Sequence, residues 1–543
     1  MKRKTFLYIA IFFLMSIAIL SQPIVGDYRT VANGNWSDVV IWEVWGVIGT
    51  DWSPATTYPT ASNANTISIY HSVNVNINLI IDQTENEGEI TVASGITLTV
   101  ANGTGLDLSN SGTITNLGTI TNNGTIGHSG TGIYNHARNG GTIPAMEWGK
   151  TAPISDKLQI TGLTDTPPTS VGVQDALNTL EWNCTGQTII AYILSTNLIP
   201  SSLFNIASTN NPIGKLLLPE ISGKSNITIN QGIDSYVQLQ GNIELGSVTA
   251  AYNNNGVLDC SDYTIGGTGN FSLNDNATIE VWSDLGINGH ITVSGTTSFG
   301  HSNYIYKGGT QVTGSYLPTY IRTLERACYT KTPQDLTLTN NYIIITNELT
   351  LTHGRIVIPS SKYIELEVNA VVSGSPFVQR MVILGGNDSF FRKKFSSDQE
   401  TIFTFPIGTY NSSTFDYEYT PADMNLEIGL TKTNYIDVYC DDISIFNLGW
   451  TYYLDRYWYV NLQGDVTYEA TFTYVSNDLI GGDDTKIKFG RHTGSSMWDY
   501  SGGYIDIGKF GIITDPTNSN YYFSGIQQMI YLNLKLFLQG VYK

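Results

Sequence analysis

The sequence predicts an all-β protein, a parallel β-helix or solenoid followed by a C-terminal β-sandwich. Only 13% of the 543 residues are charged, whereas Gly (54) and Tyr (33) are abundant, a composition rich in turn formers and strand formers. Short segments in which apolar and polar residues alternate fill most of the chain, and a period of two is typical of strands. A six-residue repeat in the first third indicates that these strands wind into coils.

The first element is a leader peptide, which we assign to residues 1–21. Three basic residues at 2–4 precede an apolar run at 6–20, and the small residue Ser21 follows. These are the three parts of a secretory signal peptide. The alternative is a membrane anchor, but the apolar run is shorter than the roughly 18–20 residues of a comfortable span. We therefore expect a secreted or outer-surface protein without stable membrane insertion after cleavage.

Residues 22–140 are expected to form a capped β-solenoid. The segment begins with an aromatic-rich stretch that contains Trp36, Trp45 and Trp52. Such rings either cover the open end of the first coil or stack on sugar rings. We favour capping, and glycan stacking by these three tryptophans is the alternative.

The six-residue repeat covers residues 112–126, where Gly-Thr-Ile begins at positions 112, 118 and 124. A period this short gives one strand and one corner per unit, as on the successive faces of a coil. The isoleucines should fill the interior, and the asparagines should lie at corners where side-chain amides bond from coil to coil. These residues are Ile114, Ile120 and Ile126 inside, and Asn116 and Asn122 at the corners.

Two further regions follow. Strand signals resume after a Gly- and Pro-rich stretch at 140–168, and we assign residues 141–370 to a second solenoid region. From about residue 371 the strands lengthen and aromatic residues become frequent. Long strands with one polar and one aromatic face are typical of two packed sheets, so residues 371–543 are assigned to a β-sandwich.

Charge and cysteine content exclude several classes of function. A formal net charge of −19 repels nucleic acid, because phosphate binding needs clustered Lys and Arg. Four widely spaced cysteines without a CxxC pair do not suit a zinc site. One or two disulfides or buried thiols remain the alternatives for Cys184, Cys260, Cys328 and Cys440.

Several motifs, taken in order, resemble those of large exported Bacteroidetes surface proteins that leave the cell by the type IX route. The matching segments are residues 26–37, 42–43, 181–187, 258–271, 405–408, 419–421 and 456–458. The opening is also similar, more loosely, to G8-type β-helix modules. The resemblance implies an adhesin-like protein with a β-helix and a distal sandwich. The related chains carry a second cysteine before the Trp-Asn-Cys element, but residues 155–158 hold none.

No catalytic motif is evident. The seven histidines are scattered without metal-ligand spacing, and the sequence has neither a nucleophile elbow nor a P-loop. Acidic pairs at 441–442 and 483–484 could supply oxygens to Ca²⁺, which needs about 6–8 of them. Solvated carboxylates are the favoured interpretation, and Asp478, Asp483 and Asp484 are the candidate calcium ligands. We expect no other cofactor.

The expected function is that of a non-enzymatic structural or adhesive surface protein. Stacked coils would present repetitive polar faces for multivalent binding to extracellular glycans or surfaces. The alternative is a β-helix polysaccharide lyase or glycoside hydrolase, which predicts converging Asp or Glu side chains with basic residues on one solenoid face.

Overall fold

The computed structural model describes residues 23–527 and shows an all-β chain, 54% strand and 2% helix. The predicted fold class is therefore confirmed. The leader at residues 1–21 lies outside the described residues. Within the described part, no helix combines the length and apolar character that a membrane span requires. Internal segments that are not described are 47–50, 83–87, 110, 130, 148–156, 171–172, 175–176, 194–198, 387, 397–400, 412–413, 429–433, 444–451, 464–465, 482–486, 493–497, 500–502, 507–508 and 516–520.

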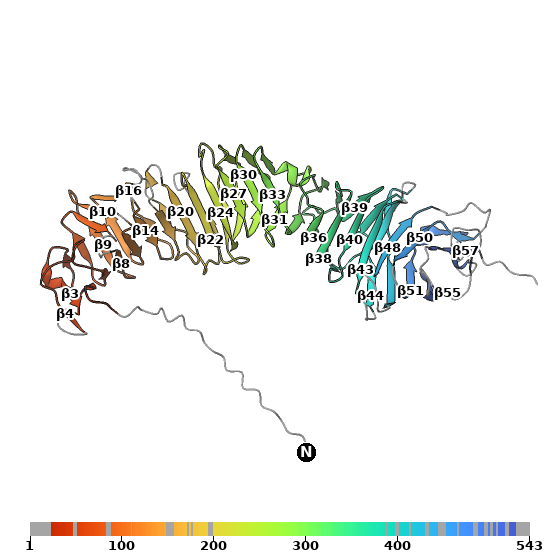
Figure 1. The fold of residues 1–543 in the computed structure, drawn as a ribbon, viewed down its shortest axis with the longest axis horizontal. Coiled ribbons are helices and arrows are strands. Elements are labelled where there is room, and N and C mark those ends of the chain that lie inside the picture. Colours follow the sequence, from red (N-terminus) through yellow and green to blue (C-terminus); the bar gives the residue numbers. More distant parts are fainter. Residues whose placement is uncertain are drawn as a thin grey trace, which may run out of the picture. The chain divides into compact units, whose positions relative to one another are not determined.

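The chain divides into two compact units, Met1–Glu181 and Trp182–Lys543. Parallel β-solenoid coils make up the first unit and the larger part of the second, about 13 turns in all (Figure 1). The sequence analysis placed its first boundary between solenoid regions at residue 140, whereas the division of the structure falls after residue 181.

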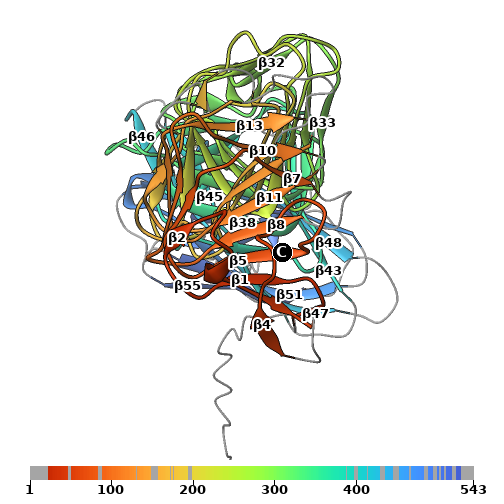
Figure 2. The same ribbon diagram turned by 90° about the vertical axis from the view of Figure 1, so that its left-hand side faces the viewer.

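In the first unit, the three strands of the six-residue repeat, β11 (Thr113–Asn116), β12 (Thr119–Asn122) and β13 (Thr125–Ser129), lie in three different sheets, so the repeat runs around a single coil. Figure 2 shows β11 and β13 of this coil. Each strand pairs in parallel with a strand of the preceding coil. The three pairs are β11 with β8 (Glu89–Val92), β12 with β9 (Thr97–Val100), and β13 with β10 (Gly105–Ser109).

The interior of these coils is aliphatic, as predicted. Ile114, Ile120 and Ile126 are buried. Each is aligned with an aliphatic residue of the preceding coil, namely Ile90, Leu98 and Leu106 in that order. Because every coil adds residues to the same columns, the interior is continuous from coil to coil. Burial of each such side chain stabilises the fold by about 1.5–3 kcal/mol.

The two corner asparagines differ from the prediction. Nδ2 of Asn116 donates to Oη of Tyr134 (2.8 Å), and Nδ2 of Asn122 donates to the carbonyl oxygen of Ala145 (2.7 Å). Neither asparagine bonds to a second side-chain amide, so the predicted amide ladder at these positions is wrong. Strand alternation explains why Asn116 is buried. It follows Ile114 by two positions, so its side chain points to the same interior side of the strand. Amide-to-amide bonds do link Asn35 with Asn74 and Asn230 with Asn253.

Antiparallel strands close the start of the first unit. Strand β1 (Tyr28–Thr30) pairs in parallel with β5 (Thr66–Ile69) of the first coil and antiparallel with β3 (Trp42–Trp45). Strand β4 (Trp52–Pro54) pairs with the other edge of β3. These short strands cover the edge that an uncapped solenoid would expose.

The second unit continues in parallel pairs as far as β43 (Phe390–Phe395) and β45 (Ile407–Asn411). One of its faces carries a long run of paired strands. They include β23 (Lys215–Leu218), β25 (Tyr236–Leu239), β28 (Val257–Asp259), β31 (Thr278–Val281) and β34 (Asn303–Tyr306).

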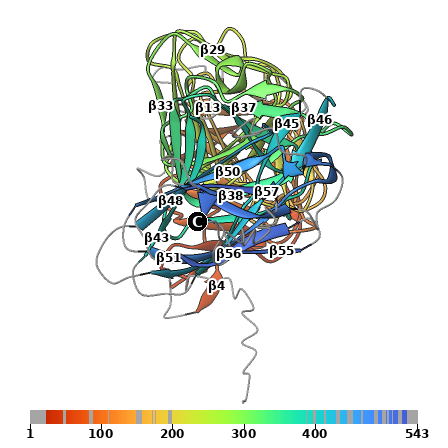
Figure 3. The same ribbon diagram turned by 90° about the vertical axis from the view of Figure 1, so that its right-hand side faces the viewer.

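Beyond β43 the pairing becomes antiparallel. One sheet continues through β48 (Asn434–Asp441), β50 (Tyr457–Gln463) and β57 (Tyr521–Gln527). A second sheet contains β44 (Thr401–Phe405), β47 (Ala422–Ile428), β51 (Val466–Thr473), β56 (Lys509–Asp515) and β55 (Gly503–Asp506). Figure 3 shows the two as separate layers. The ring of Phe472 in the second sheet lies 5.4 Å from Trp458 and 5.1 Å from Phe523 in the first. The β-sandwich stays a prediction for this region.

The cysteines correspond to one of the two alternatives. Cys184, Cys260, Cys328 and Cys440 are buried thiols, and no disulfide joins them.

Candidate functional site

The candidate site is a cavity of about 400 Å³ in the second unit. It lies along the sheet β35-β37-β39-β42-β45-β46, and five of these six strands contribute to its lining. The contributing strands are β37 (Asp335–Thr337), β39 (Arg355–Pro359), β42 (Val382–Gly385), β45 and β46 (Asp416–Tyr419). This volume lies within the range of ligand pockets, roughly 300–1,000 Å³.

A carboxylate in the lining is held by two neighbours. Nε of Arg355 donates to Oδ1 of Asp335 (2.7 Å), and Oη of Tyr417 donates to Oδ2 (2.8 Å). Register explains the first bond, because Asp335 and Arg355 are direct partners across β37 and β39. The guanidinium of Arg355 also lies 3.5 Å from the ring centre of Tyr417. Burial raises the pKa of Tyr417, which therefore stays protonated and acts as the donor.

An exposed aromatic ring lies beside this carboxylate. Tyr410 is 44% exposed, and its ring centre is 5.0 Å from that of Tyr417, its partner across β45 and β46. Arg355 already covers the ring of Tyr417, so Tyr410 is the ring that a ligand can contact. The cavity thus combines an accessible aromatic surface with a fixed hydrogen-bond acceptor.

A buried ionic cluster lies next to the cavity. Thr409 lines the cavity, and its Oγ1 accepts a hydrogen bond from Nη1 of Arg456 (2.7 Å). The guanidinium of Arg456 has no exposed surface, and it pairs with three carboxylates. Nε donates to Oδ2 of Asp478 (2.8 Å), while Nη2 donates to Glu418 and to Oδ1 of Asp442 (3.2 Å).

The cluster has more negative than positive charge. Ligand atoms of Glu418, Asp442 and Asp478 lie within 4.8 Å of one another. Burial raises the pKa of Glu418, and burial together with neighbouring carboxylates raises the pKa of Asp442 to about 6. Oδ1 of Asp478 is buried and has no hydrogen-bond partner. Three carboxylates and one guanidinium therefore lie together in a buried cluster.

The cluster contains one predicted calcium ligand and residues that the sequence analysis missed. Asp478 belongs to it, and Asp442 comes from the acidic pair noted at 441–442. Asp483 and Asp484 lie outside the described residues. Neither Glu418 nor Arg456 had been proposed as a site residue, although Arg456 belongs to the matching segment 456–458. The sequence signal that could have indicated Glu418 is the alternation at 417–419, where one acidic residue lies between two tyrosines. In the structure this carboxylate is buried.

The three tryptophans proposed for glycan stacking lie in the first unit. Trp36 is fully buried, in edge contact with Trp42 at 4.9 Å, so it caps the solenoid and offers no ring to a ligand. Trp45 and Trp52 are half-buried and contact each other edge to face at 5.5 Å. The guanidinium of Arg29 lies 4.4 Å from the ring centre of Trp52. Glycan stacking stays a prediction for Trp45 and Trp52.

Two carboxylates lie side by side on an outer solenoid face of the second unit. Asp259 and Glu280 are direct partners across β28 and β31. Oη of Tyr236 lies 2.8 Å from Oε2 of Glu280 and 3.4 Å from Oδ2 of Asp259. Nζ of Lys307 pairs with Glu280 (2.5 Å), and Trp282 donates to Asp259 (2.8 Å). The two acidic residues are only 3% and 6% exposed, so neighbouring side chains cover them.

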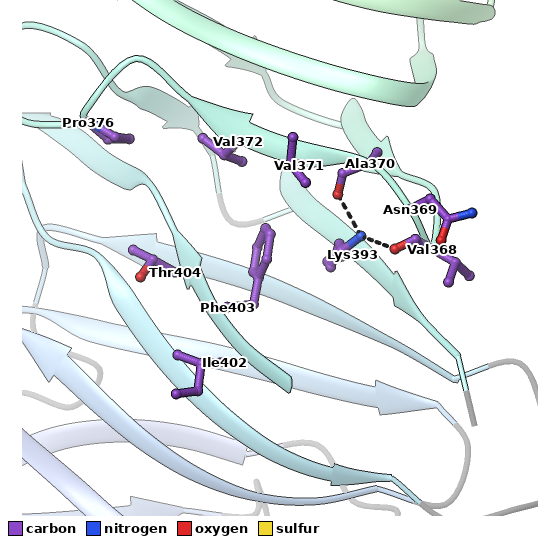
Figure 4. Close-up of a pocket in the computed structure, with 10 residues that line it drawn as sticks. All are labelled: Val368, Asn369, Ala370, Val371, Val372, Pro376, Lys393, Ile402, Phe403 and Thr404. Carbon is purple, nitrogen blue, oxygen red and sulfur yellow. Dashed lines mark hydrogen bonds between the residues drawn. The ribbon is translucent and has the colours of Figure 1, made fainter. Parts of the chain in front are cut away.

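A second cavity, of about 480 Å³, is mainly apolar (Figure 4). Nζ of Lys393 lies beside it and donates to the carbonyl oxygens of Glu367, Val368 and Ala370 (2.6–2.8 Å). These three bonds use all the donors of the ammonium group. Burial lowers the pKa of Lys393 to about 8. The lysine therefore holds the chain between β40 (Tyr363–Leu366) and β41 (Val371–Ser373).

Fold and cavity together define a parallel β-solenoid protein with an aromatic and acidic pocket. Neither protein-family models, nor curated proteins, nor solved structures give a match to this chain.

Proposed function

We propose that this chain is a secreted or cell-surface β-solenoid protein of structural or adhesive type that binds extracellular glycans. The observation that carries the proposal is the exposed ring of Tyr410 beside Asp335, a carboxylate fixed by Arg355 and Tyr417. A sugar ring presents C–H groups that pack on an aromatic face and hydroxyl groups that donate to carboxylates. Ligand sites commonly combine such apolar contacts with a few fixed polar groups.

Charge narrows the class of glycan. The protein carries a formal net charge of −19, and the cavity is lined by the carboxylates of Asp335 and Asp441. A sulfated or uronate-rich polysaccharide would be repelled by this surface. Neutral polysaccharides are therefore the proposed ligands.

The solenoid supports a display role. Parallel coils with a continuous aliphatic interior form a regular scaffold whose outer side chains repeat at the strand spacing, about 4.8 Å. Weak contacts that repeat along a polymer add up through effective concentration, so one modest site per molecule suffices when many molecules share a surface.

A glycan array probed with residues 22–543 tests the proposal. We expect binding to neutral polysaccharides and about a tenfold loss of affinity in Tyr410→Ala, which corresponds to about 1.4 kcal/mol. Tyr192→Ala is the matched control, since this tyrosine is 54% exposed but lies outside the cavity. Equal binding by wild type and Tyr410→Ala would exclude the cavity as the glycan site.

The second candidate function is glycan cleavage, which the Asp259–Glu280 pair favours. Two carboxylates on neighbouring strands that share one tyrosine hydroxyl resemble the acid and base or nucleophile pair of glycoside hydrolysis. A reducing-end assay on neutral polysaccharides, with Glu280→Gln as the comparison, tests this function. Release of sugar ends by wild type but not by the variant would support it, and no release by wild type would exclude it.

A further inference from the structure

Five separate segments meet at the guanidinium of Arg456. Thr409 lies in β45, Glu418 in β46 and Asp478 in the 3₁₀ helix η5 (Ser476–Asp478), while Asp442 directly follows β48. Arg456 itself directly precedes β50. Among the described residues, Arg456 is the only positively charged residue that forms an ion pair with these three carboxylates. The ionised cluster therefore has a formal charge of −2, and buried charge of this kind is costly unless it is compensated.

One buried carboxylate oxygen of the cluster, Oδ1 of Asp478, has no hydrogen-bond partner. Oδ2 of Asp478 accepts hydrogen bonds from Arg456 and from the backbone N–H of Val475 (2.9 Å). Oδ1 of the same side chain has no partner, although the side chain is fully buried. A buried carboxylate oxygen without a donor is rare in folded proteins. A bound cation would satisfy it.

We propose that Glu418, Asp442 and Asp478 bind one Ca²⁺ ion. Together with Arg456, a divalent cation brings the formal charge of the cluster to zero. Each carboxylate gives one oxygen to the guanidinium. Of the second oxygens, Oδ1 of Asp478 has no partner, and Oε1 of Glu418 accepts one hydrogen bond from Asn411 (3.2 Å) and keeps a lone pair for the ion.

The spacing and the donor type select the ion. All donors are oxygens, which suit hard cations such as Ca²⁺ and Mg²⁺. The ligand atoms of the three residues lie within 4.8 Å of one another, so they can share one ion. They come from three separate segments, and Ca²⁺ accepts such an irregular set of oxygens more readily than Mg²⁺, which requires near-octahedral geometry. Three carboxylates fall short of the about 6–8 oxygens that Ca²⁺ takes, so bidentate binding and water would complete the shell.

Thermal unfolding of the chelator-treated full chain tests the site. Addition of CaCl₂ should raise the melting temperature Tm by roughly 2–4 °C or more, with a rise that follows the logarithm of the Ca²⁺ concentration above Kd. Isothermal titration should give one Ca²⁺ per chain. Mg²⁺ at the same concentrations should give a clearly smaller shift.

Asp442→Asn is the informative variant. Asp442 is the most exposed of the three, at 15%, and an amide oxygen can still accept the hydrogen bond from Arg456, so we expect the variant to fold. It should lose most of the Ca²⁺-dependent rise in Tm, whereas Glu220→Gln, a change of an exposed acidic residue, should retain all of it. The same rise in wild type and Asp442→Asn, no rise in wild type, or an equal rise with Mg²⁺ would overturn the proposal.

Discussion

Arg456 holds the end of the second unit together through charge. Its fully buried guanidinium pairs with Glu418, Asp442 and Asp478. Its removal therefore leaves three buried carboxylates without a positively charged partner. We predict that Arg456→Met lowers the free energy of unfolding by about 3–5 kcal/mol, the usual result of breaking a buried pair. Urea unfolding followed by circular dichroism measures the loss.

Arg322→Met is the matched control for this prediction. Arg322 is only partly buried, and its guanidinium donates to Oδ1 of Asn303 (2.9 Å). Its replacement should cost no more than about 1 kcal/mol. Equal losses in the two variants would show that the ionic cluster has no special role in stability.

Lys393 gives a prediction about pH. In the folded chain its pKa is lowered to about 8 by burial, whereas in the unfolded chain it returns to about 10.4. Between these values the unfolded state binds more protons, so stability rises as the pH increases through this window. Wild type should gain on the order of 2–3 kcal/mol relative to Lys393→Met between pH 7 and pH 10.4.

Urea unfolding of both proteins at a series of pH values measures this difference. Because all other titrating groups are common to the two proteins, the difference isolates Lys393. A difference that stays constant from pH 7 to pH 10.4 would contradict the lowered pKa.

At this scale the sequence predicted interior residues better than it predicted the site. Alternation and repeat spacing were enough to place Ile114, Ile120 and Ile126 inside. The pairing of Glu418 with Arg456 depends on which strands are neighbours, and no local pattern encodes that. Asp478 was a candidate calcium ligand in the sequence, but its partners Glu418 and Asp442 come from other segments of the chain.

At the scale of the coil, the repeat glycines are required by close backbone contact. A Cβ at Gly118 or Gly124 would lie 2.3–2.4 Å from carbonyl oxygens of the preceding coil. At Gly118 these are the carbonyl oxygens of Ala93 and Ile96, which accept backbone hydrogen bonds from Ile96 (3.2 Å) and Thr119 (2.8 Å), so this backbone cannot move without loss of hydrogen bonds. We predict that Gly118→Ala costs roughly 2–3 kcal/mol.

Gly127→Ala is the control in the same coil, at a glycine within β13. At Gly127 the nearest atom to an added Cβ is a side-chain oxygen of Asp107 at 3.5 Å, an ordinary contact. Thermal unfolding should show a large decrease in Tm for Gly118→Ala and almost none for Gly127→Ala. Similar values for the two variants would contradict the proposed backbone contact.

Strand existence was easier to predict than pairing direction. The alternating pattern predicted the strands, and the repeat predicted coils. From about residue 371 the sequence shows longer strands and more aromatic residues. Strand β43, which lies beyond this point, nevertheless pairs in parallel with β40 on one edge and antiparallel with β48 on the other. A strand has the same alternation in both kinds of sheet, so its own sequence does not tell which partner it takes.

At the scale of the whole molecule, two compact units predict unfolding in more than one step. Solenoid coils contact mainly their neighbours, so stability is local and two-state behaviour fails for long arrays. Gly118→Ala should shift the transition of the first unit alone, and Arg456→Met that of the second alone. Hydrogen exchange measured by mass spectrometry assigns each transition to its segment, and a single transition shifted by both variants would contradict this prediction.

Composition was sufficient for the all-β class, because low charge with abundant turn and strand formers leaves few alternatives. The boundary at residue 140, which the Gly- and Pro-rich stretch suggested, stays a prediction. Strand β17 (Lys157–Ile160), which follows it, pairs in parallel with β14 (Ile133–His136), which precedes it. Turn-forming composition marks corners and boundaries alike.

The aligned columns of the first unit also constrain how the gene can change. Ile67, Ile90, Ile114 and Tyr134 lie in one column, although the chain between successive members differs in length. Residues gained or lost at a corner leave that column intact. One residue gained or lost inside a strand sends every later side chain of that strand to the opposite side. Natural length variation should therefore accumulate between strands, and the strands themselves should evolve by substitution alone.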